Sequence, residues 1–229
     1  MISARARPWM ILAGLALGVT VTNGFARFAY GLILPAMKSE LHWTYAQSGW
    51  LNTANAMGYI IGAIVTMVLI GRRSPTLLFA FGLITTTIAL LATGLNAALW
   101  WQTLWRFLAG LFGAMSFSTA GALAAGLFKD SPRQNTLAIG ILFGTGGGVG
   151  IVLAGAALPV MLDHYGNSSW PMAWVVIGAV SVSFLPLSLW AAAQLSVPAQ
   201  IQSKAPALPI RRMLAQMAGY AGFGLGYIV

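Results

Sequence analysis

The hydrophobic residues of this chain fall into six long runs separated by short polar stretches, and a seventh run continues to the last residue. The six runs cover residues 9–37, 46–70, 76–98, 101–128, 137–161 and 171–195. An α-helix needs about 20 apolar residues to cross a bilayer, so each run is long enough to span a membrane. The pattern predicts an all-α integral membrane protein with six transmembrane helices and the truncated start of a seventh.

The composition excludes a water-soluble fold. Of the 229 residues, 59% are hydrophobic and only 7% are charged, whereas a soluble domain has about 25% charged residues. The net charge of +9 comes from basic residues scattered in ones and twos between the runs, without the basic stripe typical of a nucleic-acid-binding protein. The absence of cysteine excludes disulfides and cysteine-based metal sites. We therefore expect no cofactor and no nucleic-acid partner.

The distribution of Lys and Arg in the loops predicts the orientation of the helices. If the N-terminus is cytoplasmic, nine basic residues lie in inner loops and only Lys38 lies in an outer loop. This asymmetry is typical of a multi-pass protein with a cytoplasmic N-terminus. Tryptophans near the predicted outer ends, among them Trp170 and Trp174, are typical of an aromatic belt. The nine inner residues are Arg5, Arg7, Arg72, Arg73, Lys129, Arg133, Lys204, Arg211 and Arg212.

An arginine interrupts the first hydrophobic run, inside the segment NGFARFAYGLILP at residues 23–35. A charged side chain in hydrocarbon costs at least a few kcal/mol, so it usually faces a protein interior or a water-filled cavity. On a helix, Asn23, Arg27 and Gly31 share one face, with Tyr30 beside them. The sequence predicts that this face lines a cavity and that its polar side chains bind a solute.

A second arginine, Arg106, interrupts the fourth run in the same local pattern, R-F-x-x-G. In the second run, Asn52, Asn55 and Tyr59 fit one helix face. We include all four among the candidate binding residues, and the two arginines favour an anionic solute. The alternative is structural: each arginine bonds helix carbonyls or neutral side chains, and the polar face of the second run forms interhelical hydrogen bonds.

Five segments that together cover nearly the whole chain carry a resemblance to known proteins: 27–37, 47–63, 106–114, in which an arginine is followed by small residues, 148–159 and 219–229. They resemble the major facilitator superfamily of transporters, in its YbfB/YjiJ branch. The segments at 27–37 and 47–63 look like its helices 1 and 2, and 106–114 is similar to its helix-4 motif. Residues 148–159 resemble its helix 5 to 6 region, and 219–229 resemble the start of helix 7. The loop at 69–75 lacks the aspartate usual there, and Gly144 precedes Thr145 rather than proline.

This resemblance implies a secondary transporter in the bacterial inner membrane, built from two inverted three-helix repeats in which helices 1 and 4 line the cavity. No intramembrane catalytic set is present, so we expect no enzyme; a six-helix channel or a structural membrane protein is the alternative function. No Asp or Glu lies within the predicted helices. Coupling to protons therefore lies outside this stretch, or the carrier works without it.

Three regions are predicted along the chain: a six-helix transporter bundle at 1–195, a cytoplasmic linker at 196–212, and the start of a seventh helix at 213–229. The seventh helix has no polar flank after Val229. We therefore expect an incomplete, N-terminal half whose partners are the lipid bilayer, a small-molecule solute and a missing C-terminal six-helix half.

Overall fold

The fold is all-helical throughout the part of the chain that the computed structural model describes, residues 7–128, 130–195, 214–215 and 218–219. Six of its helical stretches are long and apolar enough to cross a membrane, and no strand occurs in these ranges. The elements are α1 Arg7–Val19, η1 Thr20–Phe28, α2 Ala29–Glu40, α3 Tyr45–Leu69, α4 Pro75–Thr93, α5 Leu99–Ala124, α6 Pro132–Tyr165, η2 Asn167–Ser169 and α7 Trp170–Ala193. Elements α1, η1 and α2 form one continuous span, from Arg7 to Glu40.

The predicted all-α fold with six membrane-spanning helices is confirmed, although two helices are longer than their hydrophobic runs. Helix α6 begins with Pro132, whose missing N–H costs nothing in the first turn, and it ends at Gly166, which adopts a positive φ of 79°. These end signals extend α6 to 34 residues, into the polar flanks of its apolar run. The predicted linker and most of the predicted seventh helix lie outside the described residues.

Local capping explains where two of the other helices start. Thr44 and Gln47 form a reciprocal capping box at the start of α3, in which each side chain bonds the other residue's backbone N–H. Ser74 accepts a hydrogen bond from the Leu77 N–H at the start of α4, and Pro75 occupies the first helical position. The short loops before α3 and α4 therefore end where the sequence supplies a cap.

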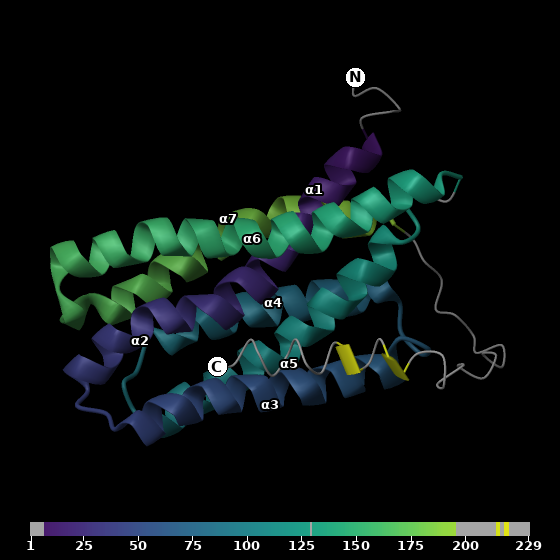
Figure 1. The fold of residues 1–229 in the computed structure, drawn as a ribbon. Helices are drawn as coiled ribbons and strands as arrows, with labels where there is room; N and C mark the ends of the chain where they lie inside the picture. The colour runs from purple at the N-terminus through teal and green to yellow at the C-terminus, as the bar shows by residue number, and fades with distance from the viewer. Residues whose placement is uncertain (1–6, 129, 196–213, 216–217, 220–229) are drawn as a thin grey trace.

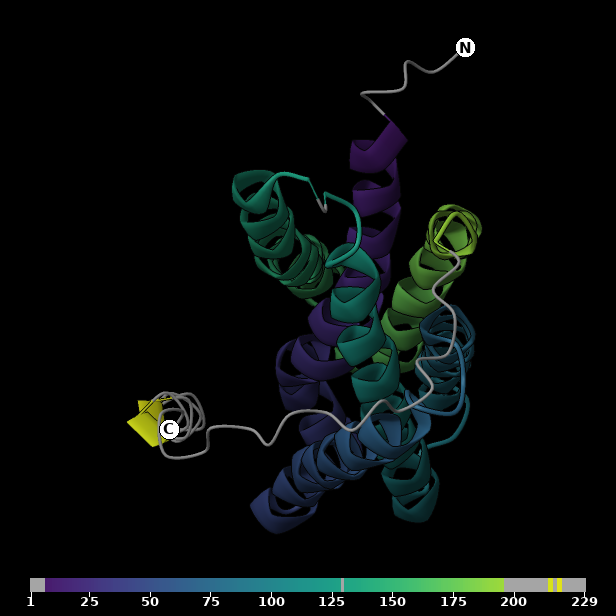
Figure 2. The ribbon, with the colours of Figure 1, turned by 90° about the vertical axis from the view of Figure 1, so that its right-hand side faces the viewer.

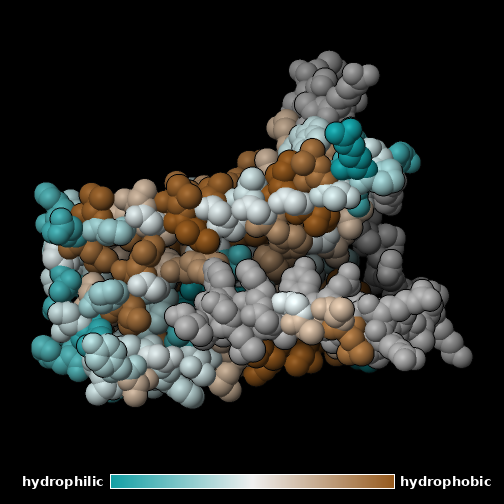
Figure 3. All heavy atoms as spheres, in the orientation of Figure 1, coloured by the Kyte–Doolittle hydropathy of each residue, from teal (hydrophilic) through white to brown (hydrophobic). Residues whose placement is uncertain are grey.

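The helices form a bundle in which α3 and α6 flank one face (Figure 1). The first span and α5 lie between these two helices, and α4 and α7 lie on the opposite side, as the view along the bundle shows (Figure 2). Hydrophilic residues gather at the ends of the bundle, and hydrophobic residues cover its length (Figure 3). This distribution fits a molecule whose sides lie in a bilayer and whose ends lie in water.

The packing partners repeat between the two halves of the bundle. Helix α3 packs on α5 and α6 packs on the first span, while α4 packs on α5 and α7 packs on α1. Helices α4 and α7 contact each other, as do α5 and η1. In chain order, span 1 is α1–η1–α2, and spans 2 to 6 are α3, α4, α5, α6 and α7. Exchanging spans 1, 2 and 3 for spans 4, 5 and 6 leaves this pattern unchanged, as two related three-helix repeats require.

Glycines allow close approach at two crossings that correspond under this exchange. A methyl group at Gly58 or Gly62 of α3 would meet the carbonyl oxygens of Phe107 and Leu111 on α5. At the other crossing, a methyl group at Gly24 of η1 would meet Gly150 of α6. Small residues let helix backbones approach closely in a membrane, so the crossing of spans 2 and 4 and the crossing of spans 5 and 1 are packed in the same way.

Candidate site on the exposed face of the first span

Arg27 lies on an exposed part of the first span, within the π-helical segment η1. Short π-helical segments are frequent at functional sites, and this one covers nine residues from Thr20 to Phe28. Thr20 donates a hydrogen bond to the Gly146 carbonyl oxygen, at 2.8 Å, and thereby ties the segment to α6. Arg27 is the next-to-last residue of this segment.

The guanidinium of Arg27 lies against aromatic rings. Its Cζ atom is 5.2 Å from the centroid of the Tyr59 ring on α3 and 5.9 Å from that of Phe28. Both distances are within the range of a cation–π interaction. The structure thus brings together Arg27 and Tyr59, two of the predicted binding residues, from different helices.

Arg106, by contrast, is buried inside the bundle, with 1% of its surface exposed. Its Nη1 donates a 2.7 Å hydrogen bond to the carbonyl oxygen of Ala26, and its Cζ lies 4.6 Å from the Tyr30 ring centroid and 5.7 Å from that of Trp174. Its Nε and Nη2 atoms have no hydrogen-bond partner among the described residues. Arg106 therefore links α5 to the first span and to α7 from the interior.

Two further predicted binding residues form buried interhelical hydrogen bonds around Arg106. The Tyr30 hydroxyl donates to the Ser48 carbonyl oxygen at 2.8 Å, and the Asn55 side-chain amide donates to the Arg106 carbonyl oxygen at 2.9 Å. Each bond connects α3 to a neighbouring helix. We call Tyr30, Asn55 and Arg106, together with Trp174, the buried cluster.

The remaining predicted residues, Asn23 and Asn52, lie toward solvent rather than in the buried cluster. Asn52 is exposed, and Asn23 is half-buried with its amide nitrogen beside Gly147 of α6. The seven predicted residues are therefore divided: Asn23, Arg27, Asn52 and Tyr59 are at least partly accessible, whereas Tyr30, Asn55 and Arg106 are buried.

The two matching R-F-x-x-G segments occupy different environments. A methyl group at Gly31, after Arg27, would meet no atom within 4 Å, whereas one at Gly110, after Arg106, would meet the Asn55 carbonyl oxygen. Arg106, from α5, nevertheless bonds the carbonyl oxygen of Ala26, the residue directly before Arg27, so its guanidinium reaches the turn of the first span that carries Arg27. The sequence predicted that both arginines face a shared cavity; in the structure Arg27 is exposed, whereas Arg106 is buried where α5 meets the first span.

Other residues of this region were not predicted from the sequence. Trp174 was assigned to the aromatic belt, but it is fully buried against Arg106. Phe117 of α5 and Phe143 of α6 are half-buried beside Tyr59, with ring centroids 6.2 Å apart for Tyr59–Phe117 and 4.7 Å for Phe117–Phe143. In a chain with 11 phenylalanines, sequence alone does not distinguish these two from packing residues.

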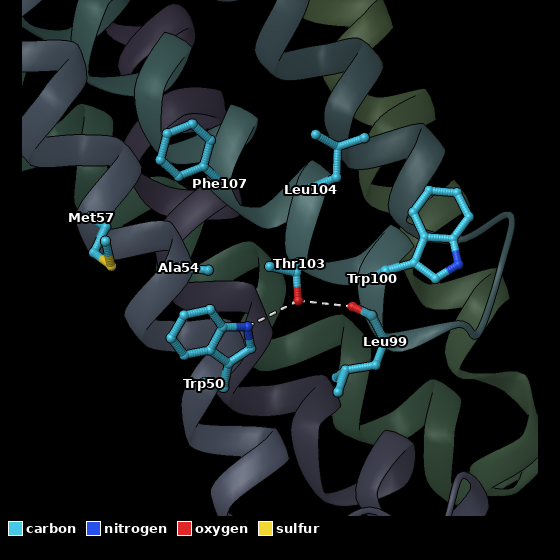
Figure 4. A pocket seen from close by; sticks show the side chains of 8 residues that line it. All are labelled: Trp50, Ala54, Met57, Leu99, Trp100, Thr103, Leu104 and Phe107. Atoms are coloured by element: carbon cyan, nitrogen blue, oxygen red, sulfur yellow. Dashed lines mark hydrogen bonds between the residues drawn. The ribbon is translucent and has the colours of Figure 1, made fainter.

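An apolar groove of about 520 Å³ lies elsewhere, between α3 and the start of α5 (Figure 4). Its lining includes Trp50, Met57, Trp100 and Phe107, and the indole Nε1 of Trp50 donates to the Thr103 hydroxyl at 3.1 Å. A charged solute would find no ionic partner among the residues that line it. The groove therefore fits apolar material better than the charged solute predicted from the arginines.

A second hollow of about 430 Å³ lies between α2 and the C-terminal part of α6. It is lined in part by Asp163, Asn167 and Pro35. Its single carboxylate gives it a charge opposite to that of Arg27. Among the described regions, the face around Arg27 combines an exposed cation near the middle of a span with aromatic rings from the first span and α3.

Comparison with known proteins identifies the family. The model of the family described as "Uncharacterised MFS-type transporter YbfB" matches residues 19–229, which is most of the chain. The chain belongs to this family. The MFS resemblance of the sequence motifs is thus confirmed, and family membership favours a transporter over an enzyme or a channel.

Two curated relatives of this MFS-type chain are named as transport or export proteins. It is 29% identical over 150 residues to the tetracenomycin C resistance and export protein of Streptomyces glaucescens, covering 62% of this chain and 26% of the relative. It is 30% identical over 163 residues to a putative metabolite transport protein of Haemophilus influenzae, covering 69% of this chain and 38% of the relative. The chain therefore spans well under half the length of either curated relative.

Solved structures support the same fold. A bacterial homologue of the human lysosomal transporter Spinster, in an inward-facing and unoccupied conformation, superposes with a TM-score of 0.68 at 20% identity, covering 91% of this chain and 47% of that one. The nucleoside transporter NupG (D323A mutant) gives a TM-score of 0.65 at 11% identity, covering 94% and 52%. In both, the MFS-type chain corresponds to about half of a transporter.

Proposed function

We propose that this chain forms one six-helix half of a secondary transporter that carries a small anionic solute across the bacterial inner membrane by alternating access. Family membership and the transport proteins among its relatives support the transport function. The half-length match to solved transporters supports the division into halves, with a second six-helix half as the partner. We further propose a cytoplasmic N-terminus, in line with the basic residues of the inner loops.

The observation that supports an anionic solute is the exposed Arg27 in the first span. All three acidic residues of the sequence lie at helix ends or in turns: Glu40 ends α2, Asp163 is in the last turn of α6, and Asp130 is in the turn before α6. No carboxylate of this chain therefore belongs to the middle of a span. A cation at this depth is unfavourable unless water or an anion compensates it, and an anionic solute supplies the missing charge.

The accessible residues Asn23, Arg27, Asn52 and Tyr59 contact the solute in this proposal. Tyr30, Asn55 and Arg106 hold the helices that carry them, and Arg106 does so by bonding the turn directly before Arg27. Coupling to protons lies outside the described spans, or the carrier works without it, since these spans contain no mid-span carboxylate and no histidine other than His164 at the end of α6.

Thermal stability of the purified full chain in detergent, measured against organic anions, neutral sugars and cationic drugs, tests this proposal. A bound compound stabilises the native state by mass action, by roughly 2.7 kcal/mol at 100 times its dissociation constant. We expect stabilisation by anions that disappears in Arg27→Gln and persists in Arg72→Gln, which removes an exposed loop arginine. Stabilisation only by neutral or cationic compounds would contradict the anionic solute.

A further inference from the structure

Three aromatic rings form a continuous row beside Arg27, across three helices. Tyr59 of α3, Phe117 of α5 and Phe143 of α6 follow one another with ring centroids 6.2 Å and 4.7 Å apart. All three side chains are half-buried and so retain accessible surface. We call these residues the aromatic row.

A glycine on α5 allows the Phe143 ring of α6 to approach α5. A methyl group at Gly121 of α5 would lie 2.9 Å from the Cζ atom of Phe143. Because Gly121 has no side chain, the Phe143 ring lies close enough to α5 to reach Phe117. The row is therefore a joint surface of α3, α5 and α6 rather than three separate side chains.

Arg27 lies at the Tyr59 end of the row, with its Cζ atom 5.2 Å from the Tyr59 centroid. One end of this surface thus carries a full positive charge, and the rest consists of aromatic carbon. Guanidinium groups bind carboxylates through paired hydrogen bonds, and aromatic rings bind planar rings in offset or edge-to-face contact. A ligand that satisfies both parts has a carboxylate at one end and an aromatic ring at the other.

We infer that the solute is an aromatic carboxylate, whose carboxylate pairs with Arg27 and whose ring lies on the aromatic row. This inference rests on the proposed anionic solute and narrows its chemical class. Asn23, an accessible amide of the predicted site, lies four residues before Arg27 on the same span. The ring contact selects aromatic over saturated acids of the same size.

Four matched compounds test charge and ring separately: 3-phenylpropanoate, 3-cyclohexylpropanoate, 3-phenylpropanamide and 3-cyclohexylpropanamide. Their binding to the purified full chain is measured by thermal shift and by isothermal titration calorimetry. We expect 3-phenylpropanoate to bind roughly 2–10-fold more tightly than its cyclohexyl counterpart, the increment measured for aromatic pairs. We expect it to bind at least about 10-fold more tightly than the phenyl amide, because hydrogen bonds to a charged group are stronger than neutral ones.

Two substitutions assign these preferences to their residues. Arg27→Gln should abolish the preference for acid over amide, and Phe117→Leu should abolish the preference for phenyl over cyclohexyl while leaving the acid preference. The matched controls are Arg72→Gln and Phe81→Leu, the latter an exposed phenylalanine of α4 outside the row. Both controls should keep both preferences.

The possible results separate this inference from the proposed function. Equal binding of phenyl and cyclohexyl acids, each lost in Arg27→Gln, would overturn the aromatic class and leave the anionic solute intact. A phenyl preference that survives in Phe117→Leu would also overturn the role of the row. Equal binding of acids and amides would overturn both this inference and the anionic solute. Binding of none of the four compounds would overturn this inference alone.

Discussion

At the scale of single residues, the two arginines differ in burial and in the groups that they contact. Arg27 is exposed and contacts Tyr59, whereas Arg106 is enclosed by the Tyr30 and Trp174 rings and bonds one backbone carbonyl. Removing a fully buried side chain leaves a cavity and unpaired groups, but removing an exposed one changes little. Substitution of Arg106 should therefore act on stability, and substitution of Arg27 should act on binding.

We expect Arg106→Ala to lower the free energy of unfolding by roughly 2–5 kcal/mol, the range for truncation of large buried side chains. Arg27→Ala, at an exposed position, should change it by about 0.5 kcal/mol or less. Thermal denaturation of both variants in the same detergent, without solute, measures the difference. A larger loss in Arg27→Ala than in Arg106→Ala would contradict the assignment of Arg106 to packing.

The sequence pointed to the polar residues of the proposed site and to Tyr59, but not to Phe117 and Phe143. A charge or an amide within a hydrophobic run is conspicuous because it is costly in a membrane. Phe117 and Phe143 are ordinary in such runs, and only the three-dimensional packing places them beside Tyr59. Arg106 was visible for the same reason as Arg27, but the sequence pattern R-F-x-x-G carries no information about which of two equal motifs is buried.

At the scale of helices, close crossings depend on glycines whose positions the sequence shows but whose contacts it does not. Helix α6 contains glycines on two sides: Gly146 and Gly150 contact the first span, whereas a methyl group at Gly140 or Gly144 would meet no atom within 4 Å. The positions of glycines in a sequence do not show which of them pack against a neighbouring helix. The structure assigns packing to the first pair.

Gly110→Ala should destabilise the protein, because the added methyl group would meet the Asn55 carbonyl oxygen at the α3–α5 crossing. Overpacking of this kind costs roughly 1–3 kcal/mol. Gly140→Ala is the matched control: its methyl group meets nothing within 4 Å, and alanine is the better helix former by about 1 kcal/mol. Thermal denaturation that shows equal losses in both variants would contradict the close crossing.

The π-helical form of Thr20–Phe28 was not predictable from hydrophobic periodicity. A pattern of apolar positions distinguishes a helix from a strand but does not distinguish a π-turn from an α-turn within one long run. The Thr20–Gly146 hydrogen bond that accompanies this segment joins residues from the first and fifth spans. Such long-range bonds become visible only once the helices are placed next to each other.

At the scale of the whole molecule, the number and approximate position of the membrane spans followed from hydrophobicity, because backbone groups in lipid must be satisfied within a helix. The helix ends were less predictable, since capping residues and not apolar content set them, as Pro132 and Gly166 do for α6. The pairing of the helices followed only from the resemblance of the motifs to a known family.

The proposed orientation is testable directly because the protein contains no cysteine. A single cysteine at Asn167, exposed beyond the outer end of α6, should react with a membrane-impermeant maleimide in intact cells. A cysteine at Gln134, exposed at the inner end of α6, should react only after the cells are lysed. The reverse pattern would place the N-terminus outside and contradict the distribution of basic loops.

A bundle of six helices is not expected to transport a solute on its own. Alternating access in this superfamily arises when one half-bundle rocks against the other around a central site. The chain aligns with 47% and 52% of two solved transporters, and α3 and α6 flank a face that none of the other four described spans covers. We therefore expect the chain of 229 residues alone to bind its solute more weakly than a two-half transporter and to move none across a membrane.

Counterflow in proteoliposomes that contain the chain measures whether it transports the solute. The vesicles are loaded with unlabelled 3-phenylpropanoate, and the labelled acid is supplied outside. The flux should equal that of the Arg27→Gln variant, which serves as the binding-deficient control. Flux above this control would show that the second half is supplied within the preparation, and chemical cross-linking would then distinguish a second copy of the chain from a monomer. Because rocking requires two bodies and the described helices pack as one bundle, we expect the two fluxes to be the same.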